Sequence, residues 1–125
     1  MILGVGTDII EIDRVKRAIQ NEHFIKRVYT DKEINYCESR GRQAASSYAA
    51  RFAGKEAVLK AFGTGLRDGS LLDIEILPDE LGAPQVTLYG HFAALAAKKN
   101  IAAAHISLSH AREYATACCV LEEKE

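Results

Sequence analysis

The amino-acid sequence predicts an α+β domain in which an antiparallel sheet packs against one long central helix. The first indication is a stretch from residue 43 to residue 62, whose apolar residues recur at helical spacing. The second is a set of short stretches rich in β-branched residues on both sides of it. Together they give the order strand, helices, hairpin, helix, hairpin. A chain of 125 residues suits one core, so we expect residues 1–125 to form a single domain.

The central helix has two unlike sides on a helical wheel. A bulky apolar side, expected to face the core, is formed by Tyr48, Val58, Leu59 and Phe62, and a side of very small volume is formed by Ala49, Ala53 and Ala57. Glu56 and Lys60 stand at the border of the alanine side and share a face, because they are four residues apart. They form either an ordinary surface ion pair or a charged site that another group can approach closely. Gly63 is placed to end the helix, and Gly65 continues a loop whose N–H groups can bind an anion.

Residues 2–12 predict a buried strand, because isoleucine, leucine and valine dominate this stretch. Asp8 lies in its middle, where a carboxylate needs a partner, a hydrogen-bond network or a metal ion. The alternative is a turn after Gly6 and Thr7, with Asp8 as a local cap.

Three helices are predicted between the first strand and the central helix. Asp13 is expected to cap a helix from residue 14 to about residue 21, and a short helix follows at residues 24–29. Thr30 and Glu33 have the spacing of a capping box, which predicts a further helix from residue 31 to about residue 40.

The C-terminal half predicts two hairpins separated by a helix. Residues 71–77 and 85–89 are expected to form the first hairpin, residues 91–99 an alanine-rich helix, and residues 105–110 and 114–121 the second hairpin. In the first of these strands, Asp73 and Glu75 alternate with isoleucines, which predicts a half-exposed strand.

The strand at residues 105–110, HISLSH, alternates strictly. Its apolar side chains are expected to face the core, and its other face carries His105, Ser107 and Ser109. These groups can bind phosphate oxygens, although a solvated sheet face explains the same pattern. The chain has no nucleophile elbow, Walker loop or HExxH motif. Any chemistry must therefore combine this strand with Asp8, Glu56 and Lys60.

Composition excludes several classes of protein. Apolar residues make up 48% and charged residues 26%, as in soluble globular proteins, and no apolar run is long enough to span a bilayer. The first ten residues lack the features of a signal peptide. Cys37, Cys118 and Cys119 form no CxxC pair, so we expect reduced thiols and a cytoplasmic location.

Charge is unevenly distributed along the chain. The formal net charge is −1, which indicates no role in nucleic-acid binding. The segment from residue 14 to residue 42 nevertheless carries eight basic and four acidic residues. It indicates either an acidic or phosphorylated partner or a set of solvated helix faces.

Three blocks of sequence resemble the holo-[acyl-carrier-protein] synthases, the short-chain 4′-phosphopantetheinyl transferases. They are GVGTDIIEIDR around Asp8, RFAGKEAVLKAFGTG around Glu56, and HISLSHAREYA around His105. The resemblance covers essentially the whole chain. It implies transfer of 4′-phosphopantetheine from coenzyme A to a serine of apo-acyl carrier protein, with release of adenosine 3′,5′-bisphosphate, in fatty acid biosynthesis. It also implies a magnesium requirement and a homotrimer with active sites between subunits.

The resemblance assigns roles to individual residues. Asp8 and Glu56 look like the magnesium ligands, and hard carboxylate oxygens suit that ion. Lys60 is expected to neutralise phosphate charge, so Glu56 and Lys60 are the expected catalytic residues. The remaining coenzyme A contacts are expected at Arg51, Gly63, Gly65, His105, Ser107 and Ser109, with Arg51 and His105 at the 3′-phosphate end.

Arg14, Arg17 and Arg27 fall in the region that would meet the acidic carrier protein. One position departs from the larger two-domain relatives, which have a third metal carboxylate two residues after the aspartate. Here that residue is Ile10, so a water molecule is expected in its place. Glu56 acting through a water, a metal-bound hydroxide and Asp31 stay open as the general base.

Two other functions are compatible with the same residues. One is a magnesium-dependent phosphohydrolase, which would release phosphate without a protein acceptor. The other is a carrier-protein-binding module without turnover, although such a module has no use for a metal pair. One assay distinguishes all three functions: the protein is incubated with coenzyme A, magnesium and apo-carrier protein, and the mass of the carrier protein is then measured.

Overall fold

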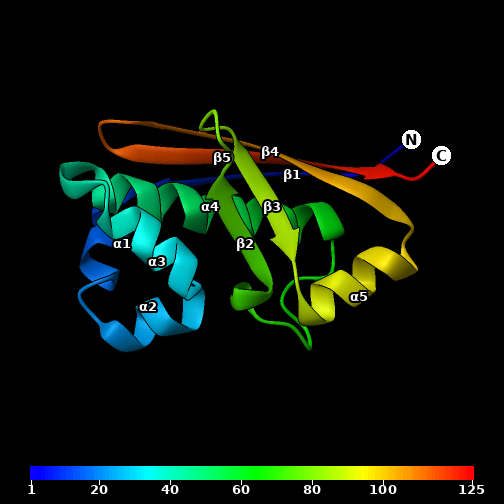
Figure 1. Cartoon of the computed structure of the whole chain (residues 1–125), viewed down its shortest axis with the longest axis horizontal. Coiled ribbons are helices and arrows are strands. Elements are labelled where there is room, and N and C mark those ends of the chain that lie inside the picture. Colours follow the sequence, from blue (N-terminus) through cyan, green and yellow to red (C-terminus); the bar gives the residue numbers. More distant parts are fainter.

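Helix α4 (Ala44–Phe62) is the element against which the others pack in the computed structural model, which describes residues 1–125 (Figure 1). One side of α4 contacts a three-stranded antiparallel sheet in the order β1-β5-β4, made of β1 (Ile2–Glu11), β5 (Tyr114–Glu123) and β4 (Ile101–Ala111). The other side is crossed by the hairpin of β2 (Ile74–Pro78) and β3 (Pro84–Leu88), which leads into α5 (Gly90–Lys98). The first half of α4 is flanked by α1 (Ile12–Ala18), α2 (Glu22–Val28) and α3 (Asp31–Glu38). The predicted α+β class and the antiparallel pairing are confirmed.

Local signals in the sequence place the ends of α3 and α4 well. The central helix starts one residue after the predicted position and ends at Phe62, where Gly63 adopts the left-handed conformation with φ of 76°. At the start of α3, the Thr30 hydroxyl accepts from the Glu33 N–H, and Glu33 accepts from the Thr30 N–H. The predicted capping box is therefore present, although α3 ends at Glu38 rather than near residue 40.

The first helix differs from its prediction because β1 runs directly into it. The helix starts at Ile12, its N-cap is Glu11 without a side-chain hydrogen bond, and Asp13 lies in the first turn instead of capping. The Ile12 N–H donates to the Glu113 carbonyl (2.8 Å), so pairing with the end of the sheet takes the place of a cap. Asn21 caps α2 instead, and α2 consequently starts at Glu22, earlier than predicted.

The predicted strand at residues 71–77 is also corrected. Leu71–Asp73 is a turn of 3-10 helix capped by Ser70, and the strand begins at Ile74. Glu75 is buried rather than solvated. Its carboxylate accepts hydrogen bonds from the hydroxyls of Thr30 (2.7 Å) and Tyr89 (3.1 Å). These partners come from distant parts of the chain, which is why alternation alone predicted an exposed side chain.

The β1-β5-β4 sheet is covered on one face only. Gly4, Gly6, Asp8 and Ile10 of β1 point toward α4, and the outward side chains of β1 are exposed, with Val5 at 58% and Ile9 at 63%. The prediction of a buried first strand therefore holds for its inward face only, and its outer face is exposed. Asp8 lies within β1, paired with Ala117 of β5, so the alternative of a local cap after a turn is excluded.

The small alanine side of α4 is filled by β1. A Cβ atom on Gly6 would overlap the Ala57 carbonyl oxygen, and one on Gly4 would overlap that of Ala61. Two glycines therefore let a strand lie directly on a helix. The space predicted over the alanines is occupied by the backbone of β1, which carries Asp8 two residues after Gly6.

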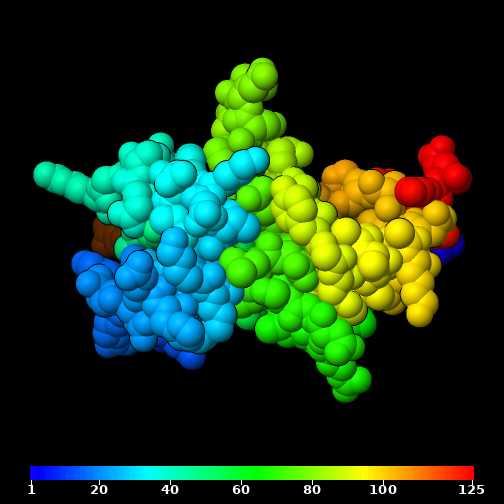
Figure 2. Space-filling model, turned by 60° about the horizontal axis from the view of Figure 1, so that its bottom comes forward, coloured from blue at the N-terminus to red at the C-terminus, as the bar shows by residue number.

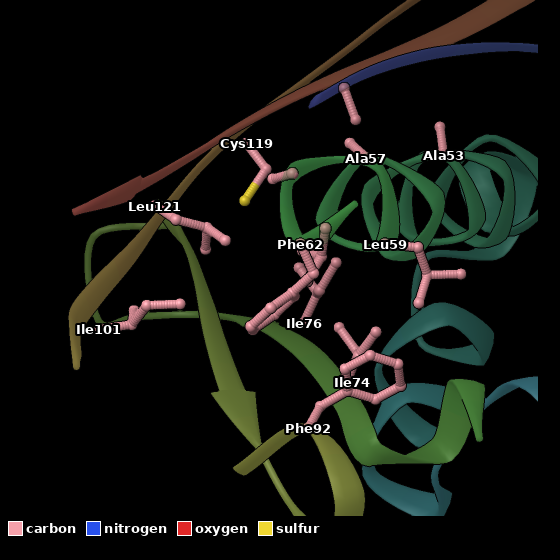
Figure 3. Packing of buried hydrophobic residues seen from close by; sticks show 13 residues of the cluster. Ala53, Ala57, Leu59, Phe62, Ile74, Ile76, Phe92, Ile101, Cys119 and Leu121 are labelled. Carbon is pink, nitrogen blue, oxygen red and sulfur yellow. The ribbon is translucent and has the colours of Figure 1, made fainter. Parts of the chain in front are cut away.

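Two apolar clusters lie on either side of this contact. The larger one joins α4 to the hairpin, to α5 and to the end of the sheet, and includes Phe62, Ile74, Ile76, Phe92 and Leu121 (Figure 3). The smaller one lies under the N-terminal helices, and Tyr29 and Tyr48 meet there with ring centroids 4.8 Å apart. In Figure 2 the turn after β2 projects from the surface, and Leu81 at this turn is 96% exposed.

A buried ion pair connects the N-terminal helices with α4 and the β2–β3 hairpin. Lys55 of α4 and Glu33 of α3 have fully buried side chains, and their charged atoms are 2.8 Å apart. The Lys55 ammonium also donates to the carbonyls of Leu71 (2.9 Å) and Ile74 (2.6 Å), and Glu33 accepts from the Ile76 N–H (2.8 Å). Burial lowers the pKa of Lys55, and the charge of Glu33 opposes that shift. Every charged atom has a partner, as buried charges require.

The three cysteines are free, as predicted. Burial raises the pKa of the Cys37 thiol to about 12 and that of Cys119 to about 11. None of the helices combines the length and the apolar character needed to cross a membrane.

Replacing Gly6 with alanine tests the contact between β1 and α4. We expect Gly6→Ala to lower the free energy of unfolding by at least ~3 kcal/mol, because strand and helix must separate to admit the methyl group. Denaturant unfolding gives the value. Gly41→Ala serves as the control, since its Cβ would meet nothing within 4 Å and only its φ of 57° is unfavourable, at a cost of about 1–2 kcal/mol. Equal losses in the two variants would contradict the close packing.

Candidate active site

The contact between β1 and α4 brings Asp8 together with Lys60. The Lys60 ammonium lies 3.0 Å from Asp8 Oδ1 and donates to the Thr7 carbonyl, also at 3.0 Å. The Asp8 side chain is only 16% exposed. An ordinary Glu56–Lys60 pair along the helix is not formed, because Lys60 reaches across to the strand instead. The sequence predicted the residues of this site, and the structure supplies their arrangement.

Glu56 shares this electrostatic environment. Burial is the main cause that raises the pKa of Glu56 above its ordinary value, the negative charge of Asp8 raises it further, and Lys60 lowers it. Two carboxylates that repel each other across a half-buried site favour a cation between them.

The donor set fits magnesium better than a metal with many protein ligands. The chain has no group of three or more His, Cys, Asp and Glu side chains that could hold a metal ion. Asp8 and Glu56 offer two hard oxygen donors, and magnesium typically takes one or two carboxylates together with phosphates and waters. The inward position after Asp8 is Ile10, and Glu11 points to the other face of the sheet. The strand therefore offers no third carboxylate beside Asp8 on this face.

Two hollows meet at Lys60. One, of about 430 Å³, lies between the end of α4 and the glycine loop and is lined by Glu56, Lys60, Gly63 and Gly65. The other, of about 630 Å³, lies on the outer sheet face, where Ser107 and Ser109 join Asp8 and Lys60. The predicted coenzyme A contacts from the glycine loop and from the two serines thus flank the same ammonium group.

Arg51 lies in a separate cavity of about 440 Å³, between α3, α4 and the start of β3. It is lined in part by Tyr36, Arg40, Gln43, Ser47, Arg51 and His110. Arg51 is 7% exposed, belongs to no ion pair in the chain, and its Nε has no hydrogen-bond partner. A buried guanidinium without a carboxylate partner is suited to an anionic ligand.

The structure does not bring His105 to this cavity. His105 lies on the outer face of the sheet, and its Nε2 is 2.9 Å from Glu122 Oε1. His110 of the same strand lines the Arg51 cavity instead. Sequence reasoning missed His110 because it considered only the strand face that carries His105. The two histidines are five residues apart, and an odd separation places them on opposite faces of the strand.

The three candidate carrier-binding arginines are exposed on the N-terminal helices, with Arg14 and Arg17 on α1 and Arg27 on α2. Arg14 borders an apolar cavity of about 270 Å³ that is also lined by Ile10, Val15, Ala18, Phe24 and Phe52. Asp31, one of the possible general bases, is exposed and pairs with Lys26 at 3.6 Å. No hydrogen bond or ion pair joins Asp31 to Asp8 or Lys60.

Comparison with known proteins identifies the family. The family model described as the 4′-phosphopantetheinyl transferase superfamily matches residues 4–119. A holo-[acyl-carrier-protein] synthase of Ruminiclostridium cellulolyticum is 51% identical over 124 residues, covering 97% of this chain and 92% of the relative. The solved structure of the synthase from Neisseria meningitidis superposes with a TM-score of 0.90 at 32% identity, covering 98% of this chain and 100% of that one.

A further structure is that of a holo-(acyl-carrier-protein) synthase from Bacillus anthracis in complex with CoA (3′,5′-ADP). It has a TM-score of 0.83 and 36% identity and covers 99% of both chains. The present chain belongs to the 4′-phosphopantetheinyl transferase superfamily. Within it, the chain is an enzyme of the holo-[acyl-carrier-protein] synthase family, which confirms the resemblance of the three sequence blocks.

The electrostatics of the site can be tested without any ligand. In Asp8→Asn the pKa of Glu56 is expected to fall, because one repelling charge is gone while burial remains. In Lys60→Met it is expected to rise, because a stabilising positive charge is lost. Titration of isotopically labelled glutamate carboxyls by NMR measures both shifts, with exposed Glu80 as internal reference. A pKa of Glu56 that moves in neither variant would show that the three groups do not interact.

Proposed function

We propose that this chain transfers 4′-phosphopantetheine from coenzyme A to a serine of apo-acyl carrier protein, with magnesium, releasing adenosine 3′,5′-bisphosphate. The observation that carries the proposal is the placement of Asp8 against Lys60 across β1 and α4, beside the glycine loop. The family membership and the relatives in complex with coenzyme A support it. The three free cysteines accord with the cytoplasmic location that we include in the proposal.

Different residues of the chain would have different roles at the diphosphate. Asp8 and Glu56 would hold magnesium, which when bound supplies Lewis-acid stabilisation of phosphate charge. Lys60 can move from Asp8 to a phosphate oxygen, since its side chain is 54% exposed.

Gly63 and Gly65 line the same hollow as Lys60. The Gly63 N–H is bonded to the Leu59 carbonyl, so N–H groups of the loop beyond it would bind the phosphate oxygens. The carrier serine oxygen would then attack the β-phosphorus and lose its proton to the general base. The bond from that phosphorus to the bridging oxygen would break, and the nucleotide phosphate would leave with this oxygen.

The substrate is long enough to need more than one cavity. We assign the diphosphate to the hollow at Lys60 and the 3′-phosphate end to the Arg51 cavity of a neighbouring subunit. Arg51 and Lys60 of one chain lie nine residues apart on opposite sides of α4, too far apart for one coenzyme A. His105, predicted at the same end, lies on the other face of its own sheet and would serve the site of a neighbouring subunit. The exposed apolar side chains on that face, Leu3, Val5 and Ile9 among them, support contact with further copies of the chain. Homotrimeric assembly is therefore part of the proposal.

The basic segment is our candidate surface for the carrier protein. In Figure 2 it occupies one end of the molecule, in blue to teal. Arg14 borders the apolar cavity between α1, α2 and α4, so one acidic and one apolar side chain of the partner could be held side by side. Such a combination of rim charge and buried anchor is usual in specific interfaces.

One assay tests the function directly. Apo-carrier protein is incubated with coenzyme A, magnesium and the enzyme, and its mass is measured. A mass increase equal to phosphopantetheine supports the proposal. Free phosphate without a change in carrier mass would indicate a phosphohydrolase, and binding without any product would indicate a non-catalytic module.

The metal ligands are tested by isosteric replacements. Asp8→Asn or Glu56→Gln should lower the rate of transfer by on the order of a hundredfold or more, because each removes a charged ligand from a site that has only two. Circular dichroism should show an unchanged fold. Glu80→Gln, in the exposed turn after β2, removes the same charge far from the site and should leave the rate unchanged. Near-normal transfer by Asp8→Asn at low magnesium would exclude the assignment.

The carrier surface is tested by charge reversal. Arg14→Glu should raise the KM for carrier protein by on the order of tenfold and leave the KM for coenzyme A unchanged. The effect should shrink as salt rises, because exposed charges are screened over about 8 Å at physiological ionic strength. Lys98→Glu on α5 is the control for net charge. If both KM values rise equally in Arg14→Glu, the residue is structural.

Shared sites between subunits are tested by mixing inactive chains. Glu56→Gln and His105→Ala homotrimers should each be weakly active. In co-refolded trimers, some interfaces combine Glu56 from one chain with His105 from its neighbour, so activity should return. Heterologous contacts in a closed ring allow this arrangement.

Light scattering establishes the oligomeric state, and native mass spectrometry establishes that hybrid trimers form. A monomeric chain would contradict the shared-site model. So would hybrid trimers that stay as inactive as their parents.

A further inference from the structure

Arg51 is a buried cation that no polar group of the chain orients. Its side chain makes no ion pair within the chain, and its Nε is buried without a hydrogen-bond partner. Packing limits where this side chain can lie, but no hydrogen bond or ion pair of the chain fixes the direction in which its guanidinium N–H groups point. Something in the cavity must therefore orient the guanidinium in advance if the site is to bind well.

Tyr36 of α3 is the residue that contacts the guanidinium face. The guanidinium carbon of Arg51 lies 4.5 Å from the centroid of the Tyr36 ring. Arg40, which also lines the cavity, lies 5.8 Å from the same centroid. A cation over an aromatic ring is attracted by the ring's quadrupole, and the contact keeps the N–H edge of a guanidinium free for an anion. One ring thus orders two positive groups at one cavity.

The Tyr36 hydroxyl takes no part in this arrangement. The tyrosines 29, 48 and 89 all donate hydrogen bonds to protein acceptors, whereas the Tyr36 hydroxyl donates none within the chain. The ring is therefore the functional part of Tyr36, and phenylalanine should replace it.

The chemistry of the proposed substrate indicates which anion Arg40 and Arg51 would bind. Coenzyme A carries a diphosphate and a 3′-phosphate. The diphosphate is assigned to Lys60 and the carboxylates, which leaves the positive cavity at Arg51 for the 3′-phosphate. Arg51 and Lys60 are nine residues apart on opposite sides of α4, so the diphosphate of the same ligand would lie at Lys60 of a neighbouring subunit. Arg40, Arg51 and His110 all line that cavity.

We propose that Tyr36 is a positioning residue that orients Arg51, together with Arg40, and so determines the preference for ligands that carry a 3′-phosphate. The proposal rests on the proposed function for the identity of the substrate. Tyr36 touches no reacting atom, so it acts on binding and not on the transfer step.

Binding of product-like nucleotides provides the first test. Adenosine 3′,5′-bisphosphate and adenosine 5′-monophosphate differ only in the 3′-phosphate. By titration calorimetry, Tyr36→Leu should weaken binding of the bisphosphate by about three- to thirtyfold, the range expected for loss of a partly desolvated cation–π contact. Binding of the monophosphate should change by less than about twofold. Tyr36→Phe should bind both nucleotides like the parent protein.

Tyr89→Leu is the control for loss of a tyrosine elsewhere in the fold, because Tyr89 is half-exposed and far from the Arg51 cavity, although its hydroxyl also donates to Glu75. It should leave both affinities unchanged. If Tyr36→Leu weakens both nucleotides equally, or weakens neither, or if Tyr36→Phe fails to restore binding, Tyr36 does not position Arg51 and the proposal is overturned.

Kinetics with two substrates separate this inference from the proposed function. With coenzyme A, Tyr36→Leu should raise the KM by the same factor as in the binding experiment and leave kcat unchanged. With dephospho-coenzyme A, which lacks the 3′-phosphate, both constants should match those of the parent. A parent enzyme that transfers nothing from coenzyme A refutes the proposed function, whereas a parent that transfers normally and a Tyr36→Leu variant with a lowered kcat refute only the inference.

Discussion

The direct contact of a strand with a helix is the constraint on which this site depends. Gly4 and Gly6 remove the side chains that would hold β1 away from α4, and the alanines of α4 accept the strand backbone. Asp8 is two residues further along the same strand face. The strand passes Ala61 at Gly4 and Ala57 at Gly6, and thus runs towards the middle of α4. The Lys60 side chain therefore reaches back along the helix to the Asp8 carboxylate, at 3.0 Å. A larger residue at either glycine would separate the groups that the proposed chemistry needs together.

Much of this could be predicted because the signals are local. The capping box at Thr30, the helix end at Gly63 and the alternation of β4 all depend on neighbours in sequence, and all three are present. The proximity of Glu56 and Lys60 could likewise be predicted, because they are four residues apart on one helix. The prediction of the site came from three blocks of sequence. The spacing of Glu56 and Lys60 alone favoured an ordinary surface ion pair.

The features that sequence reasoning missed depend on contacts between distant segments. Asp13 looked like a cap, but pairing of Ile12 with the far end of the sheet fixes that helix start. Glu75 looked exposed, but hydroxyls from α3's cap and from the end of β3 bury it. Nothing in the local pattern around Tyr36 or His110 shows that they share a cavity with Arg51. Predicting which distant residues share a cavity requires knowledge of how the sheet and the helices are connected and packed.

The buried pair of Lys55 and Glu33 has a consequence for how the chain unfolds. Its hydrogen bonds draw on α3, on α4 and on the start of β2, so each segment satisfies charges that belong to another. If the hairpin detached while the helices stayed docked, Lys55 and Glu33 would lose partners at a cost of about 1–3 kcal/mol for each buried group. Partial opening is thereby penalised, and the N-terminal helices and the hairpin should exchange their protected amide hydrogens in one cooperative event.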